Sequence, residues 1–192
     1  MIKGVIFDAD GTLLDSMGFW TSTVFDIIEL AGVKEPEPGL IEKMTPMSMY
    51  EGAVYMKENY GIELSVEEIM EQENKKVLEF YQTKVQLKKG MKELVFRYKN
   101  MNIPMVVASA TEKSMIEKAL AHVGILDCFV DVLSCSDIGK GKDFPDIFLK
   151  ACQLMNTAPE NTVVYEDSPI AIATAQNSGF FTVDVSSFSS FF

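Results

Sequence analysis

The sequence contains few of the side chains that most often carry out acid–base and metal chemistry at neutral pH. It has one histidine, His122, and three cysteines without CxxC spacing, Cys128, Cys135 and Cys152. A Ser-His pair and a multi-histidine zinc site are therefore disfavoured, and we interpret the cysteines as reduced structural thiols of a cytosolic protein. His122 is expected at a helix end, where a cation complements the helix dipole. Any chemistry must then depend on carboxylates, hydroxyls, lysines or a hard metal.

Positive charge is also scarce. Lysines and arginines number 17 against 28 aspartates and glutamates, which gives a net charge of −11. This balance argues against nucleic acid or an anionic membrane surface as the main partner, although local cations can still hold a small anionic substrate. No stretch is long and apolar enough to cross a membrane, and the apolar run before Asp8 is too short for a signal peptide. We therefore predict a cytoplasmic protein, and the sequence leaves its state open between monomer and dimer.

Hydrophobic residues, by contrast, make up 47% of the 192 positions, which is ample for one domain or for one domain that carries an insert. Helical periods alone run from position 15 to about 86, and from 88 onward strands and helices alternate. Helices are expected at 20–31, 40–44, 48–60, 65–83, 91–100, 112–123, 145–155 and 169–178, and strands at 5–7, 104–108, 129–133, 162–165 and 181–185. The tail from Ser186 to Phe192 is open between an edge segment and a frayed chain end.

The alternation of strands and helices predicts βαβ units, and hence an α/β fold with a parallel sheet covered by helices on both faces. The expected architecture is a Rossmann-like core domain built from both ends of the chain, residues 1–15 and 87–192. The wholly helical residues 16–86 form an inserted domain after the first strand. Open parallel sheets bind ligands at the carboxyl ends of their strands, near the point where the strand order reverses. The residues that follow each strand are therefore the candidate site.

Polar residues follow four of the expected strands. They are Asp8 and Asp10, Ser109 to Thr111, Lys142, and Glu166 with Asp167. Taken singly, each group has a plain structural interpretation: an acidic turn made possible by Gly11, a helix cap at Ser109 or Thr111, and a solvated loop lysine. A second pair of carboxylates at a second strand end is harder to explain in this way. The repetition favours a functional site over four unrelated turns.

The charges of these residues indicate which ligands the site would take. Four carboxylates would converge on one edge of the sheet, and each like-charge pair about 4 Å apart costs about 4 kcal/mol at an effective dielectric constant of 20. Oxygen-rich sites with open positions suit Mg²⁺ completed by water and phosphate oxygens. Lys142 adds one positive charge that a phosphate group could share. The charges therefore suit Mg²⁺ as a cofactor and a phosphate monoester as a ligand, whose oxygens could meet both the metal and Lys142.

These residues, in this order, resemble the haloacid dehalogenase-like superfamily of Mg²⁺-dependent phosphohydrolases. The resemblance is strongest to the branch that includes β-phosphoglucomutase and phosphatases with a small helical cap, and it covers nearly the whole chain. The motifs that carry it are Asp8-Ala9-Asp10-Gly11-Thr12, Ser109, Lys142 with Pro145-Asp146, and Glu166-Asp167-Ser168.

The resemblance implies a phosphoric monoester hydrolase that works through an aspartyl-phosphate intermediate. It makes Asp8 the nucleophile, and Asp10 the general acid toward the leaving oxygen and then the base for water. It makes Ser109, Ala110 and Lys142 the residues that bind the transferring phosphoryl group.

The resemblance also implies a set of metal ligands and a role for the insert. The ligands would be a carboxylate oxygen of Asp8, the backbone carbonyl of Asp10, and Asp167. Glu166 would hold a metal-bound water or support these ligands. The helical insert would be a cap that closes over the site and excludes water.

An alternative function stays open on the same scaffold. A sugar phosphomutase of the β-phosphoglucomutase type would use the same motifs, but that branch carries a cap histidine near the position of Trp20, where this chain has none. The dehalogenase branch lacks an aspartate at the position of Asp10, so dehalogenation is disfavoured. A non-catalytic regulatory module is a third interpretation, disfavoured because Asp8, Lys142 and Asp167 are all present. Hydrolysis of a phosphate ester is the leading hypothesis.

Overall fold

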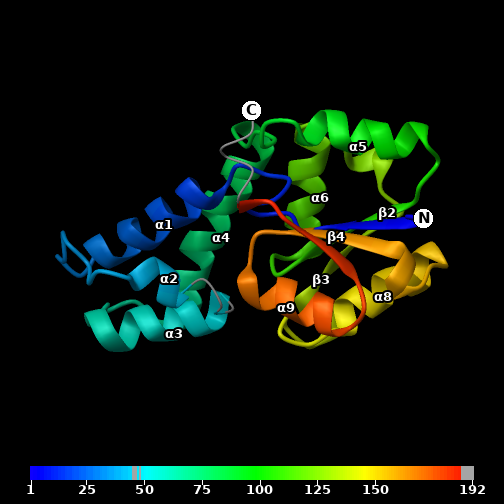
Figure 1. Ribbon diagram of the computed structural model, residues 1–192. Helices are drawn as coiled ribbons and strands as arrows, with labels where there is room; N and C mark the ends of the chain where they lie inside the picture. Colours follow the sequence, from blue (N-terminus) through cyan, green and yellow to red (C-terminus); the bar gives the residue numbers. More distant parts are fainter. Residues whose placement is uncertain (45–46, 48, 187–192) are drawn as a thin grey trace. The chain divides into compact units, whose positions relative to one another are not determined.

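The chain folds into two compact units, one of mixed α/β structure and one wholly helical. The computed structural model describes residues 1–44, 47 and 49–186. The α/β unit comprises Met1–Ser16 and Tyr81–Phe192, and the helical unit comprises Met17–Phe80 (Figure 1). In the described ranges, no helix has both the length and the apolar character that crossing a bilayer requires.

Five parallel strands form the sheet of the α/β unit. They are β1 Gly4–Phe7, β2 Met105–Ser109, β3 Asp131–Ser134, β4 Thr162–Glu166 and β5 Phe181–Asp184. Their order in the sheet is β3-β2-β1-β4-β5, and each neighbouring pair is parallel. The predicted α/β fold with a parallel sheet is therefore confirmed. The strand order reverses after β3, so the carboxyl ends of β1 and β4 lie at the switch point where such sheets bind ligands.

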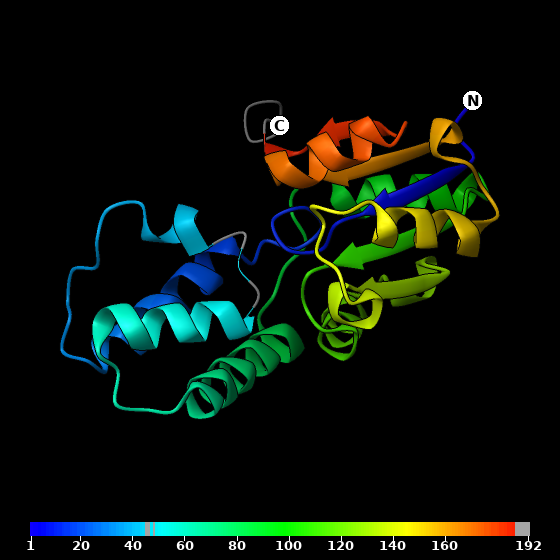
Figure 2. The same ribbon diagram turned by 90° about the horizontal axis from the view of Figure 1, so that it is seen from below.

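Helices cover both faces of this sheet. They are α5 Met91–Asn100 and α6 Lys113–His122 on one face, and α8 Asp146–Met155 and α9 Pro169–Asn177 on the other (Figures 1 and 2). Successive side chains of β1 point to opposite faces of the sheet, as strand geometry requires. Ile6 belongs to the buried cluster that contains Phe148 of α8, whereas Phe7 stacks on Tyr165 at 4.9 Å and meets Tyr98 of α5 edge-on. The sheet is therefore buried on both sides.

The helical unit has an apolar core of its own. Its helices are α1 Met17–Glu29, α2 Leu40–Met44, α3 Met49–Tyr60 and α4 Val66–Thr83, the last of which continues into the α/β unit. Ile28, Met56 and Ile69 are fully buried in one cluster contributed by three of these helices. A capping box begins α4: the Glu68 carboxylate accepts a hydrogen bond from the backbone N–H of Ser65, and the backbone N–H of Glu68 donates to Ser65 Oγ.

Several boundaries differ from those predicted. The first helix begins at Met17 instead of Trp20, and β3 spans Asp131–Ser134 instead of 129–133. Three short elements were not predicted: the four-residue helix α7 Cys135–Ile138 and the 3₁₀ turns η1 Leu126–Cys128 and η2 Pro159–Asn161. Each is too short to show a hydrophobic period. The predicted start of the third helix at Ser48, and the tail beyond Ser186, lie outside the described residues.

Candidate active site

A tight turn after β1 holds the first two aspartates. Gly11 has a φ of +82°, a conformation that glycine adopts without strain, and its N–H donates to the carbonyl of Leu14 at 3.0 Å. The turn is closed by the N–H of Leu14, which donates to the carbonyl of Ala9 at 2.8 Å. Asp8 follows the buried strand directly and is only 6% exposed. The glycine turn predicted from the sequence is therefore present, and it leaves Asp8 at the carboxyl end of the central strand.

The end of β4 contributes the second acidic pair. Glu166 is the last residue of the strand and is 2% exposed. Its Oε1 accepts the backbone N–H groups of Asp167 and Ser168, both at 3.1 Å, just before α9 begins. Ser168 occupies the N-cap position of α9, but its side chain makes no capping bond. The two N–H groups that precede the helix therefore hold the Glu166 carboxylate beside the start of α9.

Lys142 reaches the two strand ends from the loop after β3. This loop first forms α7, whose N-terminus is capped by Ser134 Oγ, and α7 ends at Gly139, which has a φ of +77°. The Lys142 side chain is 12% exposed, and its ammonium group contacts both Asp8 Oδ1 and Glu166 Oε2, the latter at 2.8 Å. A solvated loop lysine is therefore the wrong interpretation. Lys142 is a buried bridge between the ends of β1 and β4.

The charges in this cluster are only partly balanced. Asp8, Glu166 and Asp167 can each present a carboxylate oxygen within 4.8 Å of the other two. Three carboxylates facing one ammonium group leave a formal excess of two negative charges. At this separation each like-charge pair costs about 3 kcal/mol at an effective dielectric constant of 20. The arrangement therefore requires a further positive charge, a proton or a cation.

The pKa shifts report the same imbalance. Burial raises the pKa of Asp8 well above its usual range, as does the charge of Glu166, while Lys142 lowers it. Burial also raises the pKa of Asp167, to about 6, with a further contribution from Glu166. For Lys142, burial acts to lower the pKa of the ammonium group, but the charges of Asp8 and Glu166 outweigh it and raise that pKa. The carboxylates compete for a single positive partner.

The donor atoms at this point of the sheet fit a divalent hard cation. Asp8 Oδ2 is buried and accepts no hydrogen bond from the described residues. An unpaired buried carboxylate oxygen is costly unless a cation or another partner meets it. Oxygen donors from Asp8, Glu166 and Asp167, with room for water and substrate oxygens, are the type of site that Mg²⁺ uses.

The Asp10 carboxylate has a different environment, made of hydroxyl groups. Its Oδ1 accepts from Ser16 Oγ at 2.6 Å and from the Tyr81 hydroxyl at 2.5 Å, and its Oδ2 accepts from Thr111 Oγ1 at 2.8 Å. The sequence marks Thr111 as part of a strand-end group or as a helix cap, and it does not mark Ser16 or Tyr81. No local pattern marks them, because their role depends on which segments meet in space.

The loop after β2 is joined to the site through Thr111. Ser109 is 1% exposed at the end of β2, and its Oγ accepts the backbone N–H of Thr111 at 3.0 Å. The helix that follows is preceded by Glu112 at its N-cap position, so neither Ser109 nor Thr111 caps it. Ala110 lies between them and is exposed. Thr111 therefore links Ser109 to Asp10, and among the described residues no hydrogen bond joins Ser109 or Ala110 to the Lys142 cluster.

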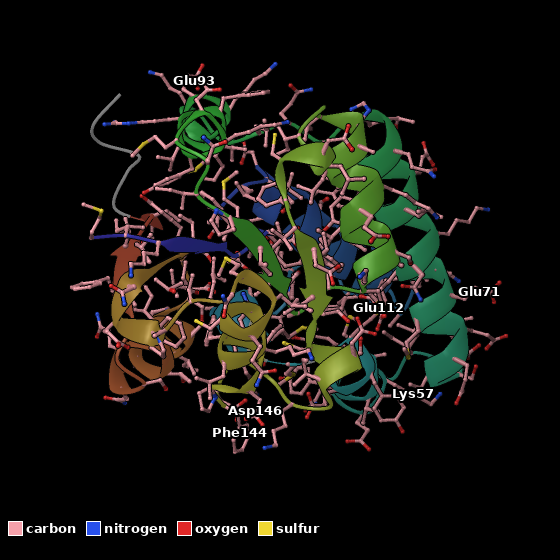
Figure 3. All side chains as sticks on the ribbon, turned by 90° about the vertical axis from the view of Figure 1, so that its right-hand side faces the viewer. Lys57, Glu71, Glu93, Glu112, Phe144 and Asp146 are labelled. Carbon is pink, nitrogen blue, oxygen red and sulfur yellow. The ribbon has the colours of Figure 1, made fainter. Side chains whose placement is uncertain are left out.

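Asp146, included in the third motif, lies apart from the cluster. Pro145 is the N-cap residue of α8, and the helix begins at Asp146, one residue later than predicted. Asp146 pairs with Lys140 at 2.8 Å on the surface, where Figure 3 shows its side chain and that of Phe144 pointing outward. Of the basic residues in this loop, Lys142 turns into the site and Lys140 stays outside it.

Comparison with known proteins gives a family and a fold. The family model for haloacid dehalogenase-like hydrolases matches residues 2–179. The chain is 27% identical to β-phosphoglucomutase of Bacillus subtilis (strain 168) over 194 residues, which cover 96% of this chain and 83% of that protein. It is 30% identical to (DL)-glycerol-3-phosphatase 2 of Arabidopsis thaliana over 192 residues, 96% of this chain and 79% of that protein. The crystal structure of β-phosphoglucomutase from Clostridium difficile has the same fold, with a TM-score of 0.80 at 23% identity over 96% of this chain and 84% of that one.

The excess negative charge predicts that Asp167→Asn stabilises the metal-free protein. Because its folded-state pKa is raised from 3.8 to about 6, the Asp167 carboxylate lowers the stability of the fold as the pH rises through that range. Below about pH 4 the carboxyl is neutral in both states, and the substitution should have little effect. Thermal unfolding in EDTA should show a higher midpoint for the variant at pH 7.5, with the difference shrinking toward pH 4.

Asp15→Asn is the matched control, because Asp15 is an exposed carboxylate directly after the turn that follows Asp10. It should leave the midpoint unchanged at both pH values. A variant at Asp167 that is less stable than the unmodified protein in EDTA at pH 7.5 would contradict the charge imbalance.

Proposed function

The chain belongs to the haloacid dehalogenase-like hydrolase family, and we propose that it is a Mg²⁺-dependent phosphatase that hydrolyses a small phosphorylated metabolite. The observation that carries this proposal is the buried Asp8, which has one oxygen on Lys142 and the other without a hydrogen bond from any residue that the structure describes. A carboxylate with a free oxygen can act as a nucleophile, and the neighbouring ammonium group can neutralise a phosphoryl group as it is transferred. The relative named as a glycerol-3-phosphatase supports a phosphate monoester as the substrate class.

In the first half of the proposed reaction, Asp8 accepts the phosphoryl group. A carboxylate oxygen of Asp8 forms a bond to phosphorus while the bond between phosphorus and the ester oxygen breaks. Asp10 gives its proton to the departing oxygen, which leaves as an alcohol. Lys142 stays beside the phosphoryl oxygens through the transfer and offsets their charge. Ser109 and the backbone at Ala110 complete the proposed phosphoryl contacts.

In the second half, water releases the phosphoryl group. Asp10, now a carboxylate, takes a proton from the attacking water, the bond between phosphorus and Asp8 breaks, and inorganic phosphate leaves. Asp8 returns as a carboxylate and Asp10 is protonated again, so the cycle closes. Three hydroxyl groups around Asp10 support this role, since a hydroxyl can donate to the carboxylate and accept from the carboxyl.

The proposed Mg²⁺ site uses Asp8, Asp167 and the backbone carbonyl of Asp10, with Glu166 holding a metal-bound water or supporting the ligands. When bound, Mg²⁺ would neutralise the excess charge of the cluster and polarise phosphoryl oxygens. Glu166 is already engaged by Lys142 and by two backbone N–H groups. Because both Glu166 oxygens already accept these hydrogen bonds, we favour the supporting role for Glu166 and assign direct metal binding to Asp167.

Two further expectations from the sequence belong to the same proposal. The helical residues 16–86 are proposed to form a cap that excludes water from the reaction. The protein is proposed to act in the cytoplasm, where its cysteines, which form no disulfide, would stay reduced.

Asp8→Asn should abolish turnover of p-nitrophenyl phosphate in the presence of Mg²⁺. An amide cannot form the phosphoenzyme, so we expect a loss of about 10³-fold or more in kcat, as for removal of other enzymatic nucleophiles. The control variant Asp15→Asn, which changes an exposed carboxylate directly after that turn, should keep nearly full activity. Addition of EDTA to the unmodified enzyme should remove turnover, and Mg²⁺ should restore it. Turnover that survives in Asp8→Asn would refute the proposed nucleophile.

A phosphomutase is the second candidate, favoured by the 27% identity with β-phosphoglucomutase across nearly the whole chain. The two functions differ in their products. A phosphatase converts β-glucose 1-phosphate or another sugar phosphate into free sugar and an equal amount of inorganic phosphate, whereas a mutase yields an isomeric sugar phosphate. We expect stoichiometric release of inorganic phosphate. A phosphate assay measures this release, and NMR of the sugar identifies the product. Accumulation of an isomer with little free phosphate would make the mutase the correct assignment.

A further inference from the structure

The Asp10 carboxylate is held by side chains from three separate parts of the chain. Ser16 and Tyr81 both donate to Oδ1, and Thr111 donates to Oδ2. Ser16 and Tyr81 are each 0% exposed, so no water competes at their side of the carboxylate. Because hydrogen bonds are directional, two buried donors to one oxygen restrict the orientation of the Asp10 carboxylate group.

The two donors to Oδ1 stand at the two places where the chain passes between its units. Ser16 is the last residue of the α/β unit before the helical unit, and Tyr81 is the first residue after it. Within the α/β unit these two connecting segments pair with each other: the N–H of Asp15 donates to the carbonyl of Gln86 at 2.9 Å. The N–H of Lys88 donates in turn to the carbonyl of Leu13 at 2.8 Å. Asp10 Oδ1 is therefore a shared anchor point for both segments.

We propose that Tyr81 and Ser16 are positioning residues for Asp10, and that Tyr81 has the larger effect. This inference rests on the proposed function, in which Asp10 protonates the leaving oxygen. A general acid must stand within hydrogen-bond reach of the atom that it protonates, and a small error in its direction costs rate. Tyr81 and Ser16 do not touch the reacting atoms; they act by holding the Asp10 carboxyl in the direction that the transfer needs.

Tyr81 has the larger effect because its hydroxyl cannot turn away. Tyr81 belongs to α4, and its wholly buried aromatic ring sets the position of the hydroxyl group. The hydroxyl group of Ser16 can change its position by rotation about the single Cα–Cβ bond. A phenol hydroxyl can donate to the ionised carboxylate and accept from the protonated carboxyl. Tyr81 can thus keep contact with Asp10 before and after the proton is transferred.

The test compares substrates that need the acid to different extents. In an alkyl phosphate such as glycerol 3-phosphate, the leaving group is a strongly basic alkoxide unless its oxygen is protonated. The leaving group of p-nitrophenyl phosphate, p-nitrophenolate, departs without a proton. Tyr81→Phe removes only the hydroxyl group and keeps the ring. We expect kcat/KM for glycerol 3-phosphate to fall about tenfold or more, and kcat/KM for p-nitrophenyl phosphate to fall less than about threefold. Ser16→Ala should change the same ratio in the same direction by a smaller factor.

Tyr98→Phe is the matched control, since Tyr98 is a buried tyrosine whose hydroxyl bonds to the Tyr165 hydroxyl at 2.8 Å on the face of the sheet covered by α5. It should leave the ratio of the two kcat/KM values, for glycerol 3-phosphate and for p-nitrophenyl phosphate, unchanged. Equal losses for both substrates in Tyr81→Phe, with the unmodified enzyme active, would overturn the positioning role and indicate a structural one. If Tyr81→Phe does not fold, an unchanged ratio in Ser16→Ala overturns the inference. Inactivity of the unmodified enzyme toward both substrates with Mg²⁺ would instead refute the proposed function.

Discussion

A single ammonium group holds together side chains that would otherwise repel one another. Lys142 contacts Asp8 at the end of β1 and Glu166 at the end of β4, which joins three distant parts of the sequence at one charge. Removing one partner of a buried ion pair typically costs about 3–5 kcal/mol, because an uncompensated charge is left behind. The compensation in this cluster is incomplete, since Asp167 is a third carboxylate. The cluster is therefore stable enough to form and still able to take a cation.

The part of this arrangement that depends on the backbone could be predicted from the sequence. Alternating strands and helices specify a parallel sheet, and the carboxyl ends of its strands must share one edge. Asp8, Lys142 and Glu166 all follow expected strands, and the balance of their charges and the family resemblance supported them as site residues. The turn at Gly11 could also be predicted, because a sharp turn needs a residue that adopts a positive φ, and glycine does so without strain.

The part that depends on the reach of side chains could not be predicted. Tyr81 lies 71 positions from Asp10 and Thr111 lies 101 positions away, and both contacts exist only because separate segments pack together. In the sequence Tyr81 is one more apolar position of a helix. The same limit explains the missed helix α7, whose four residues are too few to show a period. Local patterns thus located the charged cluster but not the hydroxyl groups that hold Asp10.

The two aspartates of the first motif have different surroundings, which suits two different roles. Asp8 faces an ammonium group and other carboxylates, while the Asp10 carboxylate accepts from three hydroxyl groups in the described part of the chain. The most direct test of the proposed nucleophile is chemical trapping during turnover. Acid quench of the enzyme with substrate and Mg²⁺, then borohydride reduction and peptide mass spectrometry, should convert Asp8 to homoserine. Reduction at another residue, or at none while phosphate is released, would contradict the assignment.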